Sequence, residues 1–567
     1  MWTYWDFNPL MKLAAFALAC FLAVYLSNNR QSVLKKLKRL AKRFSLRPWL
    51  CAAAIFGLSL TLNATLSSVR WPEPRVHDEF SYLLASDTFA QGRLTNQVHP
   101  LGEHFESFHV LSSPSVTAKY PPANSVFLAL GQVLTGHPIV GIWFALALAC
   151  TAMYWMLRAW TTPYWAMLGG MLVTIHSPIL HAWGQSYWGG AAAFLAGALV
   201  FGGLKRIYHS GLARDSMMLG CGLVLLSNAR PMEGFLISLP VLAMVGWWMI
   251  KPAKELASST SLQLRMLKIA VPLLLMGAIG IGVIGTYNKA VTGSVAKLPY
   301  HAHDDDYLEF SMLIWKDSGK AIPAYNHPRM EEYFQSFRQR QQDLRSLNNY
   351  WPDLTRRLAL LWKFYPLGMG LLVLAFPILW RNRWYRFALI ISMGLLLIHT
   401  QMITSWIFPH YLAPVAALFF LLSVATLRSI SLWRRDRKIG KMVVRTVVVF
   451  SVLKLVMLYA NYQTQMPMSP HRFVEETLEA KPAQDLVIVS YAPDYSIHKE
   501  WVYNKASIDK AGVVFARDLG GSKNLDLIDY YSGRKIWRWH LENGNETNLQ
   551  ECDSRGNPVV ALTSSNH

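Results

Sequence analysis

The sequence predicts an α-helical polytopic membrane protein of about twelve spans, with a small α/β domain after the last span. Of its 567 residues, 53% are hydrophobic and only 16% are charged. The apolar residues gather in runs long enough to cross about 30 Å of hydrocarbon at about 1.5 Å per residue. We expect spans near residues 11–27, 49–68, 137–157, 163–181, 188–204, 216–229, 234–250, 268–287, 365–380, 386–402, 409–427 and 442–461.

The charge pattern gives these spans an orientation. The net charge is +21, yet the basic residues cluster in segments between spans, above all in 28–48, which carries no acid. If 28–48 is cytoplasmic, alternation of the spans puts the other basic clusters on the cytoplasmic side as well, as the positive-inside rule requires. The charge therefore indicates topology and contact with anionic membrane lipids, and it argues against nucleic acid as a partner.

Under this topology the loops 69–136 and 288–357 and the tail face outward. Loops of this length usually have a function. We expect a short apolar helix at Ala123–Leu134, a helical second half in the second loop, and three strands in the tail, "DLVIVSYA", "AGVVFARD" and "KIWRWHLE". No internal repeat is evident.

Three parts follow from this organisation. Residues 1–48 form an extra span and a basic cytoplasmic segment, 49–461 a transmembrane domain, and 462–567 a small extracytoplasmic domain. The first apolar run lacks a basic segment before it and a cleavage site after it, so we interpret it as a retained span. Four of the five cysteines fall inside spans and Cys552 lies alone in the tail, so no disulfide framework is predicted. This pattern favours the inner (plasma) membrane of a bacterium.

Asp78 and Glu79 open an amphipathic helix a few residues past the second span. Acids in a first helical turn can simply complement the helix dipole. The alternative is a general base at the membrane surface. Polar residues gather in the same loop and favour the second interpretation; they are His77, His99, His104, His109, Lys119 and Tyr120.

A second set of candidates lies at the outward turns between spans. Arg230 and Glu233 flank a turn in "NARPMEG", where Arg230 is either a snorkelling side chain or a phosphate ligand with a planar fork. His410 and Tyr411 follow Pro409 at the start of a span, as aromatic-belt residues or as ligands of an anion.

Two further segments have competing interpretations. His181 and Trp188 lie at another outward turn, where the aromatic rings serve either as belt residues or as stacking surfaces for a sugar. "HAHDDD", 301–306, resembles a metal cluster but lacks ligand spacing, so we expect an exposed acidic loop there.

Over residues 49–430 the pattern resembles the GT-C class of membrane glycosyltransferases, which includes protein mannosyltransferases, the aminoarabinose transferases of lipid A and transferases of lipopolysaccharide core sugars. The resemblance rests on "VHDEFSYLL" at 76–84, "NARPMEG" at 228–234 and "FPHYLAP" at 408–414. The additional first span departs from the simplest members of that class.

The resemblance implies a GT-C-like fold and a reaction. A polyprenyl-phosphate-linked sugar is the donor, and a hydroxyl of a glycan, lipid or protein is the acceptor. Asp78 would be the base, with Glu79 as its partner or substitute. Arg230 would stabilise the phosphate, with His410, Tyr411 and Lys119 as further ligands of it. The remaining candidates would contact substrate; they are His77, His99, Tyr120, Glu233, His181 and Trp188.

An inverting single displacement requires no organic cofactor and no nucleotide-binding loop, although a divalent metal remains compatible with the site. The competing class is a transporter or flippase of polyprenyl-linked sugars, for which inverted repeats and polar residues at mid-membrane depth would be expected. A third possibility is a scaffold whose tail binds a partner.

Overall fold

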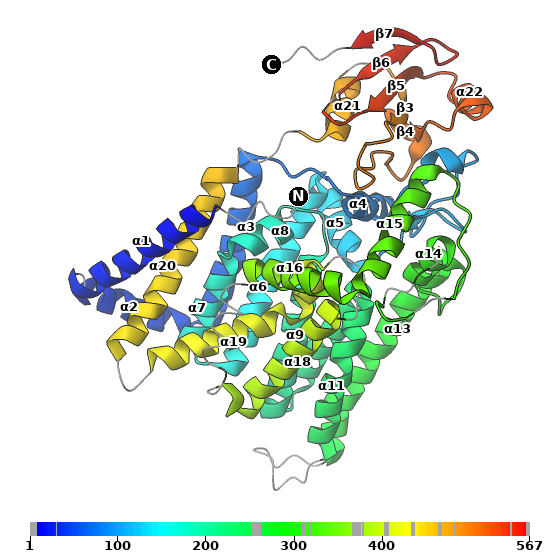
Figure 1. The fold of residues 1–567 in the computed structure, drawn as a ribbon. Coiled ribbons are helices and arrows are strands. Elements are labelled where there is room, and N and C mark those ends of the chain that lie inside the picture. The colour runs from blue at the N-terminus through cyan, green and yellow to red at the C-terminus, as the bar shows by residue number, and fades with distance from the viewer. Residues whose placement is uncertain are drawn as a thin grey trace. The chain divides into compact units, whose positions relative to one another are not determined.

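The fold was taken from a computed structural model of the chain (Figure 1). It describes residues 8–29, 31–250, 262–308, 310, 313–316, 319–365, 376, 379–401, 407–432, 437–462, 468–480, 483–544 and 547–562. The chain divides into two compact units. The first comprises Met1–Trp71, Ile139–Val283 and Ser346–Gln465, and the second Pro72–Pro138, Ile284–Arg345 and Met466–His567.

The first unit is built from helices. They are α1 (Pro9–Asn29), α2 (Gln31–Ser45), α3 (Pro48–Val69), α6 (Pro138–Trp160), α7 (Pro163–Thr174), α8 (Ser177–Gly184), α9 (Gly190–Ser210), α10 (Ala213–Ala229), α11 (Pro231–Ile250), α12 (Leu262–Arg265), the π-helical turn η3 (Met266–Ala270), α13 (Val271–Thr292), α16 (Leu347–Phe364), α18 (Arg383–Gln401), the 3-10 turn η4 (Pro409–Leu412), α19 (Ala413–Ser431) and α20 (Arg437–Tyr462).

Among the described residues, eight helical stretches are long and apolar enough to cross a membrane, which confirms a polytopic helical fold. They are α1, α3, α6, α9, α11, the run α12–η3–α13, the run η4–α19, and α20. Several expose large apolar side chains on their surface, such as Leu274 at 72% and Ile281 at 71%. An apolar surface of this kind requires an apolar solvent such as lipid.

The other predicted spans have different outcomes. The expected span 163–181 is broken into α7 and α8 at Ile175–His176, and Pro178 lies in the first turn of α8, where its fixed φ suits a helix start. The run at 216–229 forms α10, which has 17 residues, and 386–402 forms α18. Most of 365–380 lies outside the described residues.

The second unit joins the two long outward loops and the tail. Its elements are α4 (His77–Ala90), η1 (Gly102–Phe105), β1 (Val110–Leu111), β2 (Thr117–Ala118), α5 (Ala123–Thr135), α14 (Pro299–Tyr307), α15 (Pro328–Leu344), α21 (Pro470–Glu479), β3 (Asp485–Tyr491), η5 (Ile508–Lys510), β4 (Val513–Arg517), α22 (Gly521–Tyr530), β5 (Lys535–Leu541), β6 (Leu549–Cys552) and β7 (Pro558–Leu562). The short apolar helix, the helical half of the second loop and the three predicted strands are therefore present.

The tail folds around a five-stranded sheet in the order β4-β3-β5-β6-β7. Strand β3 pairs in parallel with β4 and β5, whereas β5–β6 and β6–β7 are antiparallel. Side chains alternate between the faces of a strand. In β3 the odd-numbered Val487 and Val489 therefore pack on the α21 side, and the even-numbered Leu486 and Ile488 on the α22 side.

Both faces of this sheet also bury residues of the first loop. Phe80 of α4 and Val110 of β1 belong to the core on the α21 side, and Leu101 and Phe105 pack on the α22 side. Helix α4 is accordingly more enclosed than an amphipathic surface helix, with residues 79–82, 85, 86 and 88 buried. The tail sheet thus fixes the helix that begins with His77, Asp78 and Glu79.

One expectation for the second loop is wrong. "HAHDDD" is not an exposed loop but part of helix α14, with Pro299 in its first turn. His303 is buried at 1% exposure, packed against Tyr307 and Phe334 with ring centroids 4.9 and 5.9 Å away. The apolar residues on either side of the acidic run bury one face of this helix in a core. The acidic triplet alone gave no sign of this burial.

Candidate functional site

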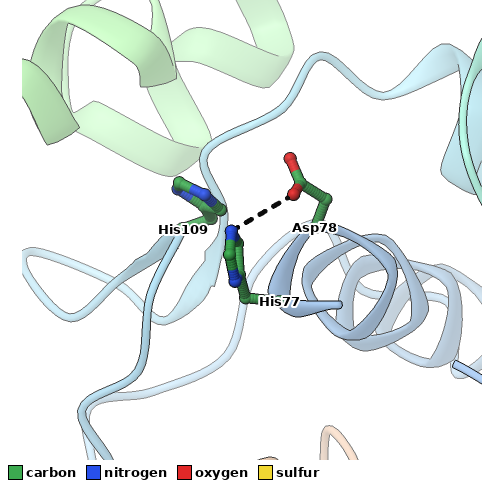
Figure 2. Close-up of side chains that lie close together, drawn as sticks. All are labelled: His77, Asp78 and His109. Atoms are coloured by element: carbon green, nitrogen blue, oxygen red, sulfur yellow. Dashed lines mark ion pairs between the residues drawn. The ribbon is translucent and has the colours of Figure 1, made fainter. Parts of the chain in front are cut away.

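Asp78 lies in the first turn of α4, shortly after α3 ends at Val69. The hydroxyl of Tyr120 donates a hydrogen bond to its Oδ1 atom. Its Oδ2 atom lies 3.4 Å from Nε2 of His77, and the Asp78 side chain is 27% exposed (Figure 2). The carboxylate is therefore oriented by two neighbours and still accessible.

His109 approaches this carboxylate from the β1–β2 hairpin. Its ring centroid lies 4.6 Å from that of His77. The backbone of His109 has φ 63°, a left-handed conformation that is uncommon for a residue other than glycine. Ser81 of α4 donates to the His109 carbonyl at 2.7 Å, and that carbonyl also accepts from the Lys119 amide at 3.0 Å. Two hydrogen bonds thus hold a strained backbone that turns the ring toward His77.

The hydroxyl of Tyr333, from α15, lies between the two histidines. It is 3.1 Å from Nε2 of His77 and 3.0 Å from Nε2 of His109. A phenol has one proton to donate, so it donates to one of these nitrogens and accepts from the other. Nε2 of His77 also faces the Asp78 carboxylate, so a proton on this nitrogen avoids placing its lone pair against the carboxylate oxygen.

Burial controls the ionisation of this cluster. It lowers the pKa of His77 to about 4, against the opposing effect of Asp78, and it lowers the pKa of His109 well below its ordinary value. Both rings are therefore neutral at pH 7. Burial also lowers the pKa of Lys119 to about 8, although Asp304 and Asp78 favour its charged form. Lys119 lies over the Tyr120 ring, 5.5 Å from its centroid.

His77, Asp78 and His109 could also hold a cation. Among the described residues they are the group whose potential ligand atoms, one from each residue, lie within 4.8 Å of one another. Ligands of a first-row divalent metal lie about 3–3.5 Å apart, so the three would need to close by about an ångström. Nε2 of His77 faces Asp78 at 3.4 Å, and both imidazoles are neutral, which is the form that binds metals. These residues fit a cation that would polarise a bound oxygen.

Two predicted residues of the second unit face elsewhere. Glu79 accepts a hydrogen bond from the Arg75 amide at 2.9 Å, so it closes the loop before α4. His99 lies 3.2 Å from Asp509 and lines a cavity of about 530 Å³ between the first loop and the tail.

In the first unit, Arg230 begins the turn between α10 and α11. Its Nη2 atom lies 2.8 Å from Glu233, and its guanidinium carbon lies 4.3 Å from the centroid of the Tyr411 ring. His399 of α18 approaches the same Glu233 oxygen at 3.3 Å. Glu233 is 5% exposed and Arg230 is 13% exposed. The guanidinium is thus fixed by a carboxylate and an aromatic face, with part of its surface accessible.

His410 and Trp188 lie beside this cluster. The Trp188 ring is 4.8 Å from His410 and 5.4 Å from Phe408, and Trp188 is 3% exposed. Its packing is that of a buried side chain, so little of the ring is available to a sugar. His181 packs instead against Tyr462, with 5.9 Å between the ring centroids.

Three residues of these clusters were not among the predicted site residues. His109 was noted in the first loop, but its role depends on a positive φ that the sequence does not indicate. Tyr333 and His399 lie far along the chain from Asp78 and Glu233. A polar residue on an otherwise apolar helix is the only signal that would have drawn attention to His399.

No protein-family model and no curated protein matches this chain. Solved structures do resemble it. ArnT from Cupriavidus metallidurans, bound to undecaprenyl phosphate, has 12% sequence identity and a TM-score of 0.48, covering 88% of this chain and 93% of ArnT.

The oligosaccharyltransferase of Archaeoglobus fulgidus, tethered to an acceptor peptide, has 10% identity and a TM-score of 0.41, with 78% of this chain and 62% of that chain covered. The archaeal oligosaccharyltransferase AglB of the same organism, in complex with an inhibitory peptide and a dolichol-phosphate, has 11% identity and a TM-score of 0.44, with 76% and 58% covered. The chain thus spans about three fifths of the length of these oligosaccharyltransferases. The TM-scores of these three structures, 0.41 to 0.48, carry no argument about the function of this chain.

Proposed function

We propose that this chain is a membrane glycosyltransferase. It would transfer a sugar from a polyprenyl-phosphate-linked donor to a hydroxyl of a glycan, lipid or protein, with inversion, at the extracytoplasmic face of a bacterial inner membrane. The observation that carries the proposal is the environment of Asp78. This carboxylate is 27% exposed, its two oxygens are oriented by Tyr120 and His77, and it follows closely on a span.

In the proposed step, the Asp78 carboxylate accepts the proton of the acceptor hydroxyl. The acceptor oxygen forms a bond to the anomeric carbon of the donor sugar as the bond from that carbon to the phosphate oxygen breaks. The polyprenyl phosphate leaves with the electron pair. A carboxylate held in one orientation by Tyr120 and His77 suits this role because it can accept a proton from a hydroxyl placed against it.

The leaving phosphate gains negative charge during this step and requires a cation. Arg230 supports that role because its guanidinium remains charged in an apolar setting and matches the geometry of a phosphate. Glu233 and the ring of Tyr411 hold it in one orientation, so little ordering is required when an anion binds.

Topology supports the assignment independently. If the spans alternate in direction along the chain, Asp78 and Arg230 both lie at outward ends of spans, after α3 and after α10 respectively. The orientation comes from lysine and arginine counts alone, without reference to either residue. A lipid-linked sugar phosphate would present its reactive bond at the outer edge of the hydrocarbon, where spans of this orientation end.

The test is incubation of purified protein with a panel of polyprenyl-phosphate sugars and a hydroxyl acceptor, with release of polyprenyl phosphate as the signal. Release that requires the acceptor and yields the opposite anomer supports the proposal. Asp87→Asn is the matched control for Asp78→Asn because Asp87 is a carboxylate of the same helix that accepts hydrogen bonds from Gln132 and the Ala506 amide. Folded protein that releases no phosphate from any donor would contradict the proposal and favour the transporter.

A further inference from the structure

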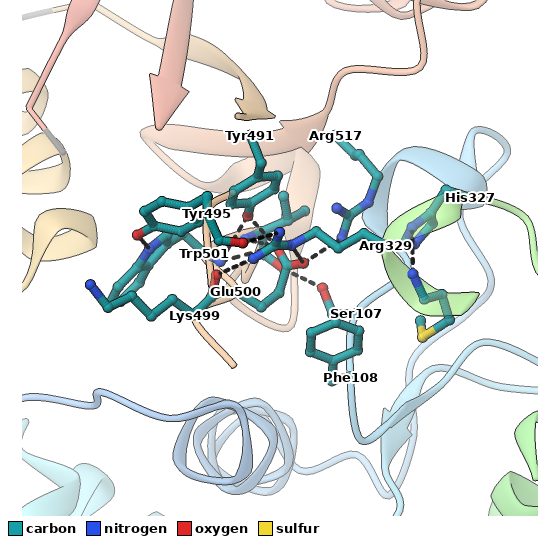
Figure 3. A network of polar contacts seen from close by, with 12 residues as sticks. Ser107, Phe108, His327, Arg329, Tyr491, Tyr495, Lys499, Glu500, Trp501 and Arg517 are labelled. Carbon is teal, nitrogen blue, oxygen red and sulfur yellow. Dashed lines mark hydrogen bonds and ion pairs between the residues drawn. The ribbon is translucent and has the colours of Figure 1, made fainter. Parts of the chain in front are cut away.

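A buried ionic network lies beside the Asp78 cluster and has no part in the reaction outlined above (Figure 3). At its centre is Glu500 of the tail, 2% exposed. Its Oε2 atom lies 2.8 Å from Arg517 and 3.5 Å from Arg329, and its Oε1 atom accepts from the amides of Trp501 and Val502 at 3.0 and 2.9 Å. One carboxylate thus joins two arginines and the backbone of the tail.

This network connects all three segments of the second unit. Arg517 belongs to the tail and donates at 3.2 Å to the carbonyl of Glu106 in the first loop. Glu106 in turn accepts from Tyr307 and Asn326 of the second loop, at 2.6 and 3.0 Å. Although burial opposes its ionisation, Arg517 and Arg329 lower the pKa of Glu500 to about 2, so the carboxylate is charged at neutral pH.

Arg329 is the attachment of helix α15 to this network. Its guanidinium donates at 2.7 Å to the carbonyls of Ser496 and Lys499, and it lies 3.9 Å from the centroid of the Tyr491 ring. Arg329 is in the first turn of α15, directly after Pro328. The start of the helix is therefore fixed to the tail by charge, hydrogen bonds and an aromatic face.

Tyr333 is four residues after Arg329, one turn further along the same face of α15. Its ring is 1% exposed and is stacked on Phe108 at 4.0 Å between centroids. Its hydroxyl lies within 3.1 Å of Nε2 of both His77 and His109. Movement of the start of α15 would move this hydroxyl, because one helical turn is a rigid connection.

We propose that the tail is a working part of the candidate site. The Glu500–Arg517–Arg329 network fixes the start of α15 so that Tyr333, as a positioning residue, holds the His77 ring beside Asp78. The inference rests on the proposed function only in that it gives Asp78 the role of base. Tyr333 acts through His77 and does not contact the reacting atoms.

A network of this kind could instead serve stability alone, since breaking a buried ion pair is strongly destabilising wherever it lies. The two roles separate in their effect on turnover. A network that only stabilises changes the fraction of folded protein and leaves the kcat of each folded molecule unchanged. A positioning network lowers the kcat of folded molecules and leaves KM nearly unchanged.

The experiment compares Tyr333→Phe, Arg329→Met and Arg329→Lys in the full-length protein, with kcat corrected for the folded fraction. The matched control is Arg472→Gln, because Arg472 also ties the tail to the first loop, through Glu73 at 3.1 Å, and in the described part of the chain its ion pairs are with Glu73 and Glu476 rather than with α15. We expect Tyr333→Phe and Arg329→Met to lower kcat about 10–100-fold with KM within about twofold. Arg329→Lys should fall between Arg329→Met and wild type, and Arg472→Gln should retain the wild-type kcat.

A second readout needs no activity. The rate at which diethyl pyrocarbonate modifies His77 and His109, followed by peptide mass spectrometry, should rise severalfold in Tyr333→Phe and Arg329→Met and remain unchanged in Arg472→Gln. If no donor is turned over but these rates rise as expected, the proposed function fails and the positioning of His77 stands. Wild-type modification rates in both variants would overturn the positioning proposal, whatever the activity.

Discussion

Two carboxylates of this molecule, those of Asp78 and Glu233, differ in their exposure and in the charge of the groups beside them. In the second unit, the Asp78 side chain is 27% exposed and has a phenol and a neutral imidazole as neighbours. In the first unit, Glu233 is 5% exposed, with a guanidinium at 2.8 Å and the His399 ring at 3.3 Å on the same oxygen.

This difference distinguishes a reactive carboxylate from an anchoring one. Asp78 can exchange a proton because its oxygens meet a phenol and a neutral imidazole rather than a paired guanidinium, and its side chain is 27% exposed. Glu233 forms an ion pair with Arg230. Removing the Glu233 carboxylate would leave the largely buried Arg230 guanidinium without that ionic partner. The contrast therefore assigns the chemistry to Asp78 and the fixing of Arg230 to Glu233.

The largest effect is expected from Asp78→Asn. An amide preserves the shape and the hydrogen bond from Tyr120 but cannot accept a proton, so kcat should fall by about 10²–10⁴-fold. The thermal midpoint of the purified protein should remain within a few degrees of wild type. A kcat within threefold of wild type would contradict the assignment of the chemical step to Asp78 and remove its distinction from Glu233.

The next effect concerns the phosphate. Replacing Arg230 with Gln removes the fixed cation and should lower kcat/KM by about 10–100-fold, as expected for loss of a charged hydrogen bond. Arg230→Lys should recover only part of this, because an ammonium group lacks the planar fork. Steady-state kinetics against donor concentration measures both variants, and equal rates for Lys, Gln and wild type would rule out a phosphate role.

Glu233→Gln should affect stability first. The Arg230 charge would lose its carboxylate in a buried setting, which costs on the order of 1–3 kcal/mol. Thermal unfolding should shift downward, and residual activity should resemble that of Arg230→Gln rather than that of Asp78→Asn. Loss of turnover equal to that of Asp78→Asn, in a fully stable protein, would instead give Glu233 a chemical role.

Lys119 gives a pH-dependent prediction. Its pKa is lowered from 10.5 to about 8 by burial, so between these values the unfolded chain binds more protons than the folded protein. Stability should therefore rise as pH increases from about 8 to 10.5, and Lys119→Gln should abolish the part of this rise due to Lys119. Unfolding midpoints of both proteins at pH 7, 8, 9 and 10 test this. A rise of the same size in the variant would contradict the assigned pKa.

The smallest effect is expected from Glu79→Gln. Glu79 accepts from the Arg75 amide at 2.9 Å, and glutamine retains an oxygen that can do the same. Activity should stay within about threefold of wild type and stability within about 1 kcal/mol. A large loss of turnover would indicate that Asp78 and Glu79 act jointly, as the sequence resemblance implies.

Local sequence patterns predicted the elements correctly where one signal dominated. Apolar runs predicted most of the helices, and short segments rich in β-branched and aromatic residues predicted β3, β4 and β5. The break between α7 and α8 was missed although His176, Ser177 and Pro178 interrupt the run 163–181, because the hydropathy of the whole run stays high and does not register a change of backbone direction.

The grouping of site residues was predictable only in part. His77, Asp78, Lys119 and Tyr120 come from one loop and do cluster. Glu79 turns away because successive residues of a helix point about 100° apart. Tyr333 joins the cluster from more than 200 residues away, and the sequence contains no signal of that approach.

The measurement that tests the central claim most directly separates donor binding from transfer in Asp78→Asn. A labelled polyprenyl-phosphate sugar is presented to the wild type, to Asp78→Asn and to Asp87→Asn in lipid nanodiscs, and bound donor and transferred sugar are measured in the same samples. A base at Asp78 predicts wild-type donor binding in all three proteins and transfer lost only in Asp78→Asn. Transfer by Asp78→Asn at the wild-type rate would contradict it.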